Sequence, residues 1–73
     1  MLYETSLGKK YAARELLPFL KHESRNYRID AGYAIAAFGG EKYRTEIEAP
    51  LKDPDEIVRK EAANMLKVID PGQ

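Results

Sequence analysis

The chain matches itself when it is displaced by 31 residues. Identical residues then meet at five places along the sequence: Gly8 and Gly39, Glu15 and Glu46, Leu20-Lys21 and Leu51-Lys52, Arg28 and Arg59, Ala31 and Ala62. Helical periodicity can bring apolar positions into register, but it does not also align a glycine, an arginine and a Leu-Lys pair. A repeat of this length predicts short units of supersecondary structure that stack, because each one cannot bury its apolar face alone.

Apolar residues recur at helical spacing along nearly the whole chain, and no stretch alternates as a strand would. The spacing predicts helices over 9–21, 24–38, 41–52 and 54–69. Their apolar stripes are Leu16, Leu17 and Leu20; Tyr27, Ala31, Ala34, Ile35 and Phe38; Tyr43, Ile47 and Leu51; Val58, Ala62, Met65, Leu66 and Ile69. Pro18 and Pro50 should kink or shorten their helices, because each lacks a backbone donor. Gly39-Gly40 predicts a left-handed C-terminal cap after Phe38.

Two helix starts are marked by capping residues. Asp53 precedes Pro54, and Glu56 follows Asp53 by three residues. This pattern predicts a capping box with Asp53 as the N-cap and Pro54 at the first helical position. Ser24 is the expected cap of the second helix.

The stretch LKDPDEIVRKEAANMLKVI, residues 51–69, resembles the second half of a HEAT-like repeat, in the short variety also seen in phycobilin lyases. The matching residues are Leu51, Asp53, Pro54, Val58, Arg59, Ala62, Ala63, Leu66 and Ile69. The earlier copy keeps Leu20, Arg28, Ala31, Ile35, Phe38 and Gly39. It departs from the pattern with His22 in place of the aspartate and Glu23 in place of the proline.

The resemblance implies an all-α fold of two tandem helix-turn-helix HEAT-like repeats that form a short α-solenoid. It also implies one domain over 1–73, divided as follows: a first repeat over about 9–39, a second over 40–70, and 1–8 as a cap or the end of a partial earlier repeat. Small residues would let the second helices pack closely, namely Ala31-Gly32 and Ala62-Ala63.

A ladder of charged residues is also implied by the resemblance. In HEAT-like proteins the arginine of the Val-Arg pair bonds the turn aspartate of an adjacent repeat, so Arg28 would reach Asp53. The candidate structural ladder is therefore Arg28, Asp53 and Arg59. An exposed pair of this kind contributes at most about 1 kcal/mol.

Two repeats are few for a stable array, which generally has at least about three repeats and polar caps. Leu2, Tyr3 and Leu7 are expected to complete one end, and nothing in the sequence covers the other. The chain is therefore expected to belong to a longer array or to self-associate.

Catalytic and metal-binding chemistry has little support in this sequence. The chain has no cysteine, so disulfides, thiolate metal sites and cysteine nucleophiles are excluded. HEAT-fold iron hydroxylases carry His-Glu pairs after the repeat arginine, but the matching positions here are Ile29-Asp30 and Lys60-Glu61. His22, the single histidine, is expected to have a surface or helix-capping role. We expect no catalysis, no cofactor and no metal.

Charge and hydropathy narrow the classes of partner. The chain has 12 basic and 12 acidic residues, and this balance argues against a dedicated binder of nucleic acid or anionic membranes. No apolar stretch approaches the ~20 residues of a membrane span, and the N-terminus has no secretory pattern. A cytoplasmic location is expected. The basic residues nevertheless concentrate in the first half, at Lys9, Lys10, Arg14, Lys21, Arg25 and Arg28.

The expected function is a protein-interaction or scaffold module whose partner is another protein or the rest of a longer array. One alternative is a nucleic-acid contact module that uses these basic residues. Another is an accessory subunit resembling phycobilin lyases. The candidate binding residues lie on the second helix of each repeat, on a face expected to be concave: Ile29, Tyr33, Ala36, Lys60, Asn64 and Lys67. Tyr33, which lies off the apolar stripe, is the expected exposed contact, whereas Tyr27 and Tyr43 are expected in the core.

Overall fold

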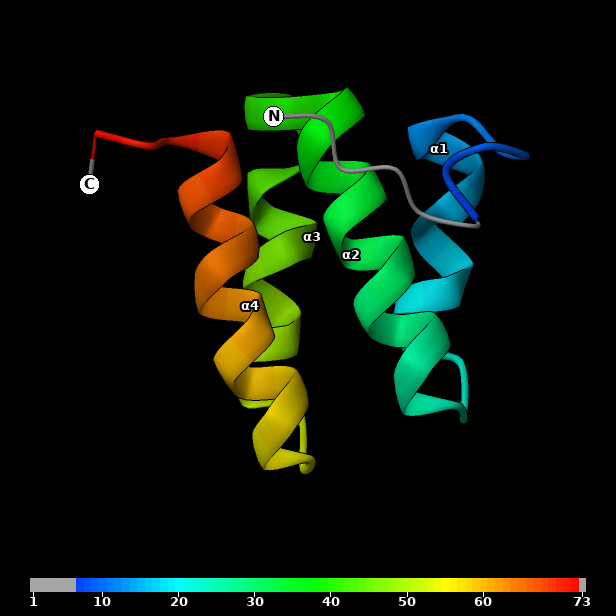
Figure 1. Cartoon of the computed structure of the whole chain (residues 1–73), viewed down its shortest axis with the longest axis vertical. Coiled ribbons are helices and arrows are strands. Elements are labelled where there is room, and N and C mark those ends of the chain that lie inside the picture. The colour runs from blue at the N-terminus through cyan, green and yellow to red at the C-terminus, as the bar shows by residue number, and fades with distance from the viewer. Residues whose placement is uncertain (1–6, 73) are drawn as a thin grey trace.

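The computed structural model describes residues 7–72, and all regular structure in that range is helical (Figure 1). The α-helices (α) and 3-10 helices (η) are, in chain order, α1 (Ala13–Leu16), η1 (Leu17–Lys21), α2 (Arg25–Gly39), η2 (Gly40–Tyr43), α3 (Arg44–Glu48), η3 (Ala49–Lys52) and α4 (Glu56–Ile69). The predicted all-α class is therefore confirmed for residues 7–72. No helix in this range is long and apolar enough to cross a membrane.

The backbone has two similar halves, residues 13–39 and residues 44–69. In the second half α3 and α4 each begin 31 residues after α1 and α2 begin in the first. The turns agree as well: His22 has φ −61° and ψ 146°, and Asp53 has φ −62° and ψ 142°. The offset found in the sequence thus relates the two halves of the described backbone.

The prolines mark where α-helix gives way to 3-10 helix. Pro18 and Pro50 each stand at the start of η1 or η3. A proline has no N–H to continue the α-helical bonding pattern, so the expected shortening of these helices is observed. Gly40 ends α2 with a positive φ of 58°, a region that glycine enters without steric cost.

The first helix begins later than expected, at Ala13 rather than at residue 9. The preceding residues form a turn, in which the backbone N–H groups of Lys10 and Tyr11 both donate to the Leu7 carbonyl at 3.0 Å.

The predicted capping box at Asp53 is wrong. Helix α4 begins at Glu56, and its N-cap is Asp55, whose carboxylate accepts a hydrogen bond from the Ile57 N–H at 2.8 Å. Asp53 Oδ1 instead accepts from the Asp55 N–H at 2.8 Å, so it stabilises the turn ahead of the helix. Pro54 therefore lies in the turn and not in the helix.

His22 has the same role in the first half that Asp53 has in the second. Its Nδ1 accepts a hydrogen bond from the Ser24 N–H at 2.9 Å. Ser24 is the N-cap of α2, as expected, but its side chain makes no capping hydrogen bond. The histidine thus supplies the acceptor that the aspartate supplies 31 residues later, which agrees with a helix-capping role for His22.

Helix α1 and η1 pack on α2, α3 and η3 pack on α4, and the main contact between the halves is α2 against α4. Figure 1 shows α2 and α4 side by side and running in the same direction. The fully buried apolar core comprises Leu16, Ala31, Ala34, Ile35, Ala36, Ile47, Val58, Ala62 and Met65. Leu7 packs on this core and its N–H donates to Asp30 Oδ2 at 3.1 Å. The expected roles of Leu2 and Tyr3 lie outside the described residues.

The apolar stripe of α2 is only partly buried. Ala31, Ala34 and Ile35 are inside, but Tyr27 and Phe38 are 45% and 57% exposed. The predicted placement of Tyr27 in the core is therefore wrong, and Phe38 of the same stripe is exposed as well. They lie on the side of α2 that no described element covers. Tyr43 is half-buried against the core, as expected.

Gly32 sets how closely α2 approaches α4. A Cβ atom built on this glycine would lie 2.4 Å from Met65 Sδ and 2.5 Å from Met65 Cε. Met65 is fully buried, so its side chain has little room to move. The expected role of small residues holds at Ala31, Gly32 and Ala62, whereas Ala63 is exposed.

We predict that Gly32→Val destabilises the protein by about 1–3 kcal/mol, because it overpacks the contact between α2 and α4. Ala63→Val is the matched control, since Ala63 stands 31 residues later and is exposed. It should cost only about 0.5 kcal/mol through helix propensity. Urea unfolding of the two variants measures the difference, and equal losses would contradict the close approach.

We predict that His22→Ala destabilises the protein by about 1 kcal/mol, because the Ser24 N–H loses its acceptor. His22→Asp should retain most of the stability, since an aspartate makes the same hydrogen bond at position 53. Thermal unfolding followed by circular dichroism compares the two. If both substitutions are equally damaging, the imidazole acts through its ring contacts rather than as an acceptor.

Candidate protein-binding site

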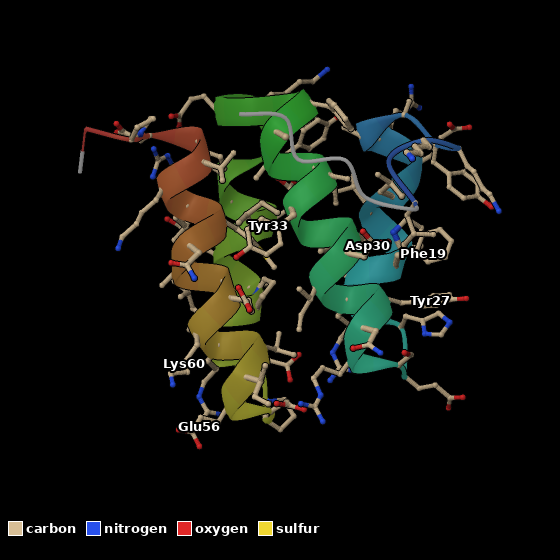
Figure 2. The ribbon with its side chains drawn as sticks, viewed as in Figure 1. Phe19, Tyr27, Asp30, Tyr33, Glu56 and Lys60 are labelled. Atoms are coloured by element: carbon tan, nitrogen blue, oxygen red, sulfur yellow. The ribbon has the colours of Figure 1, made fainter. Side chains whose placement is uncertain are left out.

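The face of α2 that was expected to be exposed to a partner packs against the second half of the chain instead. Arg25 Nε lies 3.1 Å from Asp55 Oδ2, and the Tyr33 hydroxyl donates to Glu61 Oε1. Figure 2 shows Tyr33 between α2 and α4. Tyr33 is half-buried, so its predicted role as an exposed contact is wrong. The helical spacing located this face correctly but could not show that α4 covers it.

Two further candidates on this face are removed from solvent by the same packing. Ile29 is half-buried against the core, and Ala36 is only 2% exposed. Neither is available to a partner in this arrangement. The expected concave surface on α2 is therefore absent from the described structure.

The counterpart face on α4 is open to solvent. Its six residues, each 31 positions after a residue of the α2 contact face, are Glu56, Arg59, Lys60, Ala63, Asn64 and Lys67, and all are exposed. We call them the α4 outer face. Figure 2 shows Glu56 and Lys60 at the edge of the molecule away from α2. Of the candidate binding residues, Lys60, Asn64 and Lys67 are thus brought together on one exposed face.

The contact expected between Arg28 and Asp53 is present. Arg28 Nε lies 3.0 Å from Asp53 Oδ2, although the Nε–H does not point at that oxygen, and Nη2 donates to Oδ1 at 3.5 Å. Arg28 Nη1 also donates to the His22 carbonyl at 2.7 Å. The two charged side chains are only 15% and 11% exposed, so this pair is more buried than the exposed pair that was expected.

Arg59, the third residue of the candidate ladder, makes half of the same set of contacts. Its Nη1 donates to the Asp53 carbonyl at 2.7 Å, as Arg28 Nη1 does to the His22 carbonyl. No carboxylate among residues 7–72 forms an ion pair with it. The side chain of Arg59 therefore has the same orientation as that of Arg28. It lies at an exposed position, however, and has no aspartate partner among residues 7–72.

An aromatic surface covers the opposite end of the molecule. It is formed by Tyr11, Phe19, His22 and Tyr27, and Figure 2 shows Phe19 and Tyr27 at the edge away from α4. Ring centroids are 5.4 Å apart for Tyr11 and Phe19, 6.2 Å for Phe19 and Tyr27, and 4.4 Å for His22 and Tyr27. Spacings of this size are typical of favourable aromatic pairs. Tyr11 and Tyr27 are nevertheless 39% and 45% exposed.

Sequence reasoning missed this surface because it treated the apolar stripe of α2 as core. The 31-residue offset carried the missing signal. Phe19 and Tyr27 correspond to Pro50 and Val58, which are buried in the second half. These positions are thus suited to burial, but in the first half Tyr27 is 45% exposed and Phe19 is only partly buried.

A groove of about 740 Å³ separates η1 from η3. Its walls are mainly apolar and include Leu17, Leu20, Ala49 and Pro50, and the Arg28–Asp53 pair also lines it. No group of three or more His, Asp or Glu side chains that could hold a metal ion occurs within residues 7–72. Two of the basic residues considered for nucleic-acid contact, Arg25 and Arg28, are paired with aspartates.

A separate cluster of charged residues lies beside the C-terminal end of α4. Arg44 Nε donates to Glu41 Oε2 at 2.6 Å, and Arg44 Nη2 lies 3.5 Å from Asp70 Oδ2 beyond α4. The hydrogen bond from Arg44 lowers the pKa of Glu41, and the same bond raises the pKa of Arg44. A lowered carboxyl pKa stabilises the fold above the unfolded pKa, and this contribution is lost as the pH falls through the folded value.

We predict that Arg28→Leu destabilises the protein by about 2 kcal/mol, because it leaves the mostly buried Asp53 carboxylate unpaired. Arg59→Leu is the control, since it removes the equivalent 2.7 Å hydrogen bond to a carbonyl but breaks no ion pair; the second bond of Arg28, to the exposed Glu23 carbonyl at 3.0 Å, has no counterpart in Arg59. It should cost less than about 1 kcal/mol. Chemical denaturation of both variants isolates the contribution of the carboxylate, and equal losses would show that the pair adds nothing.

Comparison of the chain with protein-family models, with curated proteins and with solved structures gave no match.

Proposed function

We propose that the chain is a protein-interaction or scaffold module made of two HEAT-like repeats in a short α-solenoid, with no catalytic activity of its own. Three features support this proposal. The two halves have matching element boundaries, their turns have matching backbone angles, and an arginine of the first half pairs with the turn aspartate of the second. Stacked repeats of this kind form extended surfaces that bind partners.

The aromatic surface is the proposed binding site, and its exposure is the observation that carries the proposal. Val58 and Pro50 show that these repeat positions are buried when a neighbouring unit is present. Phe38 extends the exposed apolar side of α2, because it follows Tyr27 by 11 residues, about three helical turns. Aromatic residues that remain exposed at a stacking position are typical of contact sites.

The occupant we propose is a helical segment of a partner protein that stacks on the first repeat as the first repeat stacks on the second. Its contacts would be mainly apolar rather than ionic. In the second repeat Asp53 and Asp55 accept the arginines of the neighbouring unit, whereas His22 and Ser24 stand at these positions in the first. A partner helix that presented arginines would meet no turn carboxylate at either position.

We predict that Tyr27→Lys reduces partner capture by the immobilised full-length chain at least about tenfold, because it places a charge in the centre of an apolar contact. Ile57→Lys is the matched control, since Ile57 is 46% exposed and lies on α4. Proteins retained from the source cell by the wild type and by Ile57→Lys, but not by Tyr27→Lys, identify partners of the aromatic surface.

Equal capture by Tyr27→Lys and by the wild type would contradict the proposed site. Circular dichroism should show that both variants remain folded, because both side chains are about half exposed. Retained nucleic acid whose binding weakens steeply with salt would instead support the alternative contact through the exposed Lys9, Lys10, Arg14 and Lys21.

A further inference from the structure

We infer that the α4 outer face is a second binding site, which takes an aspartate-containing turn of a partner protein and places the carboxylate of that aspartate on Arg59. This site lies at the opposite end of the molecule from the aromatic surface and does not depend on it. Arg28 has a carboxylate partner in Asp53, whereas Arg59 has none among residues 7–72.

Arg59 is held in the orientation that lets Arg28 bind a carboxylate. In both arginines Nη1 donates at 2.7 Å to the carbonyl of the residue six positions earlier. This hydrogen bond fixes one side of the planar guanidinium group. In Arg28 the remaining nitrogens face Asp53, with Nε 3.0 Å from Oδ2. In Arg59 the same nitrogens are available for the carboxylate of an occupant.

The charge of the face favours an acidic occupant. The contact face of α2 carries Arg25 and Arg28, and these two positive charges meet Asp53 and Asp55. The α4 outer face also has a net charge of two positive, because its three basic residues outweigh Glu56; they are Arg59, Lys60 and Lys67. Within the described part of the chain, none of the three is in an ion pair.

Glu56 determines which acidic turn fits best. It stands where Arg25 stands in the first repeat, and Arg25 binds Asp55, the second aspartate of the Asp-Pro-Asp turn. A glutamate at this position repels a second aspartate. The face should therefore prefer a turn of the form Asp-Pro-Lys, with its aspartate on Arg59 and its lysine on Glu56.

The same reasoning excludes two other occupants. A second copy of this chain would bring His22 and Ser24 to the positions that Asp53 and Asp55 hold, and neither carries a carboxylate; its one turn carboxylate, Glu23, stands at the position of Pro54 instead. A nucleic acid would place phosphates beside Glu56, where they are repelled. A partner turn that carries one aspartate satisfies both Arg59 and Glu56.

The test is an NMR titration of the isotope-labelled full-length chain with capped nine-residue peptides. The first peptide, PLKDPKEIV, copies residues 50–58 with lysine in place of Asp55. It should shift the Arg59 Nε–H resonance and the amides of Lys60 and Ala63, with millimolar affinity. The peptide PLKNPKEIV, which lacks the carboxylate, should bind about three- to fivefold more weakly, the range of an exposed ion pair.

The controls separate the roles of the two charged residues. The Arg59→Leu chain should bind both peptides equally weakly, whereas Arg14→Leu, at an exposed arginine of the first repeat, should bind as the wild type does. PLKDPDEIV should bind more weakly than PLKDPKEIV to the wild type but at least as tightly to Glu56→Gln, because Glu56 is the group that repels its second aspartate. Equal binding of the aspartate and asparagine peptides would overturn the proposal. So would a single-stranded oligonucleotide that shifts the Arg59 resonance more than either peptide.

Discussion

The packing of α2 against α4 is the contact on which the rest of the structure depends. Gly32 brings the helices close enough for Met65 to lie fully buried between them. The same approach brings Arg28 within 3.0 Å of Asp53 and holds the two turns in register. A wider separation would lose the van der Waals contact, which falls off steeply with distance, and would also weaken the attraction between Arg28 and Asp53. One small residue thus controls both the apolar and the charged part of the contact.

Because the two halves share one backbone design, their differences show what each end of the molecule is adapted to. The face of α2 that packs on α4 includes Gly32, Tyr33 and Ala36. The corresponding residues of α4 are Ala63, Asn64 and Lys67, and all three are exposed to solvent. At the other end of the molecule the exposed residue belongs to the first half: Tyr27 is 45% exposed, whereas the corresponding Val58 is fully buried. The molecule therefore has one polar end and one apolar end, and each end suits a different kind of contact.

Much of the fold could be predicted from the sequence, and most of the site could not. Helix periodicity, the prolines and Gly40 fixed the elements to within a few residues, because these signals act locally. The contact of Arg28 with Asp53 was also anticipated, through resemblance. Tyr33 and Tyr27 were assigned to the wrong environments, since a helical stripe shows which residues share a face but not which helix covers it. The cap was misplaced by two residues because Asp53 and Asp55 are equally good capping residues, and only the fold shows that Asp53 accepts from the Asp55 N–H in the turn while Asp55 caps the helix.

The polarity of the α4 outer face also bears on self-association. A head-to-tail contact would press the aromatic surface of one copy on the α4 outer face of the next and would bury Lys60 and Lys67 beside Tyr27. Burying an ammonium group without a carboxylate is strongly unfavourable, and His22 and Ser24 carry no carboxylate at the positions that Asp53 and Asp55 hold in the second half. Arrays of repeats generally end in a unit with a polar outer face for this reason. Stacking of a further copy of this chain on the α4 outer face is therefore disfavoured, while the charges of that face remain exposed to solvent.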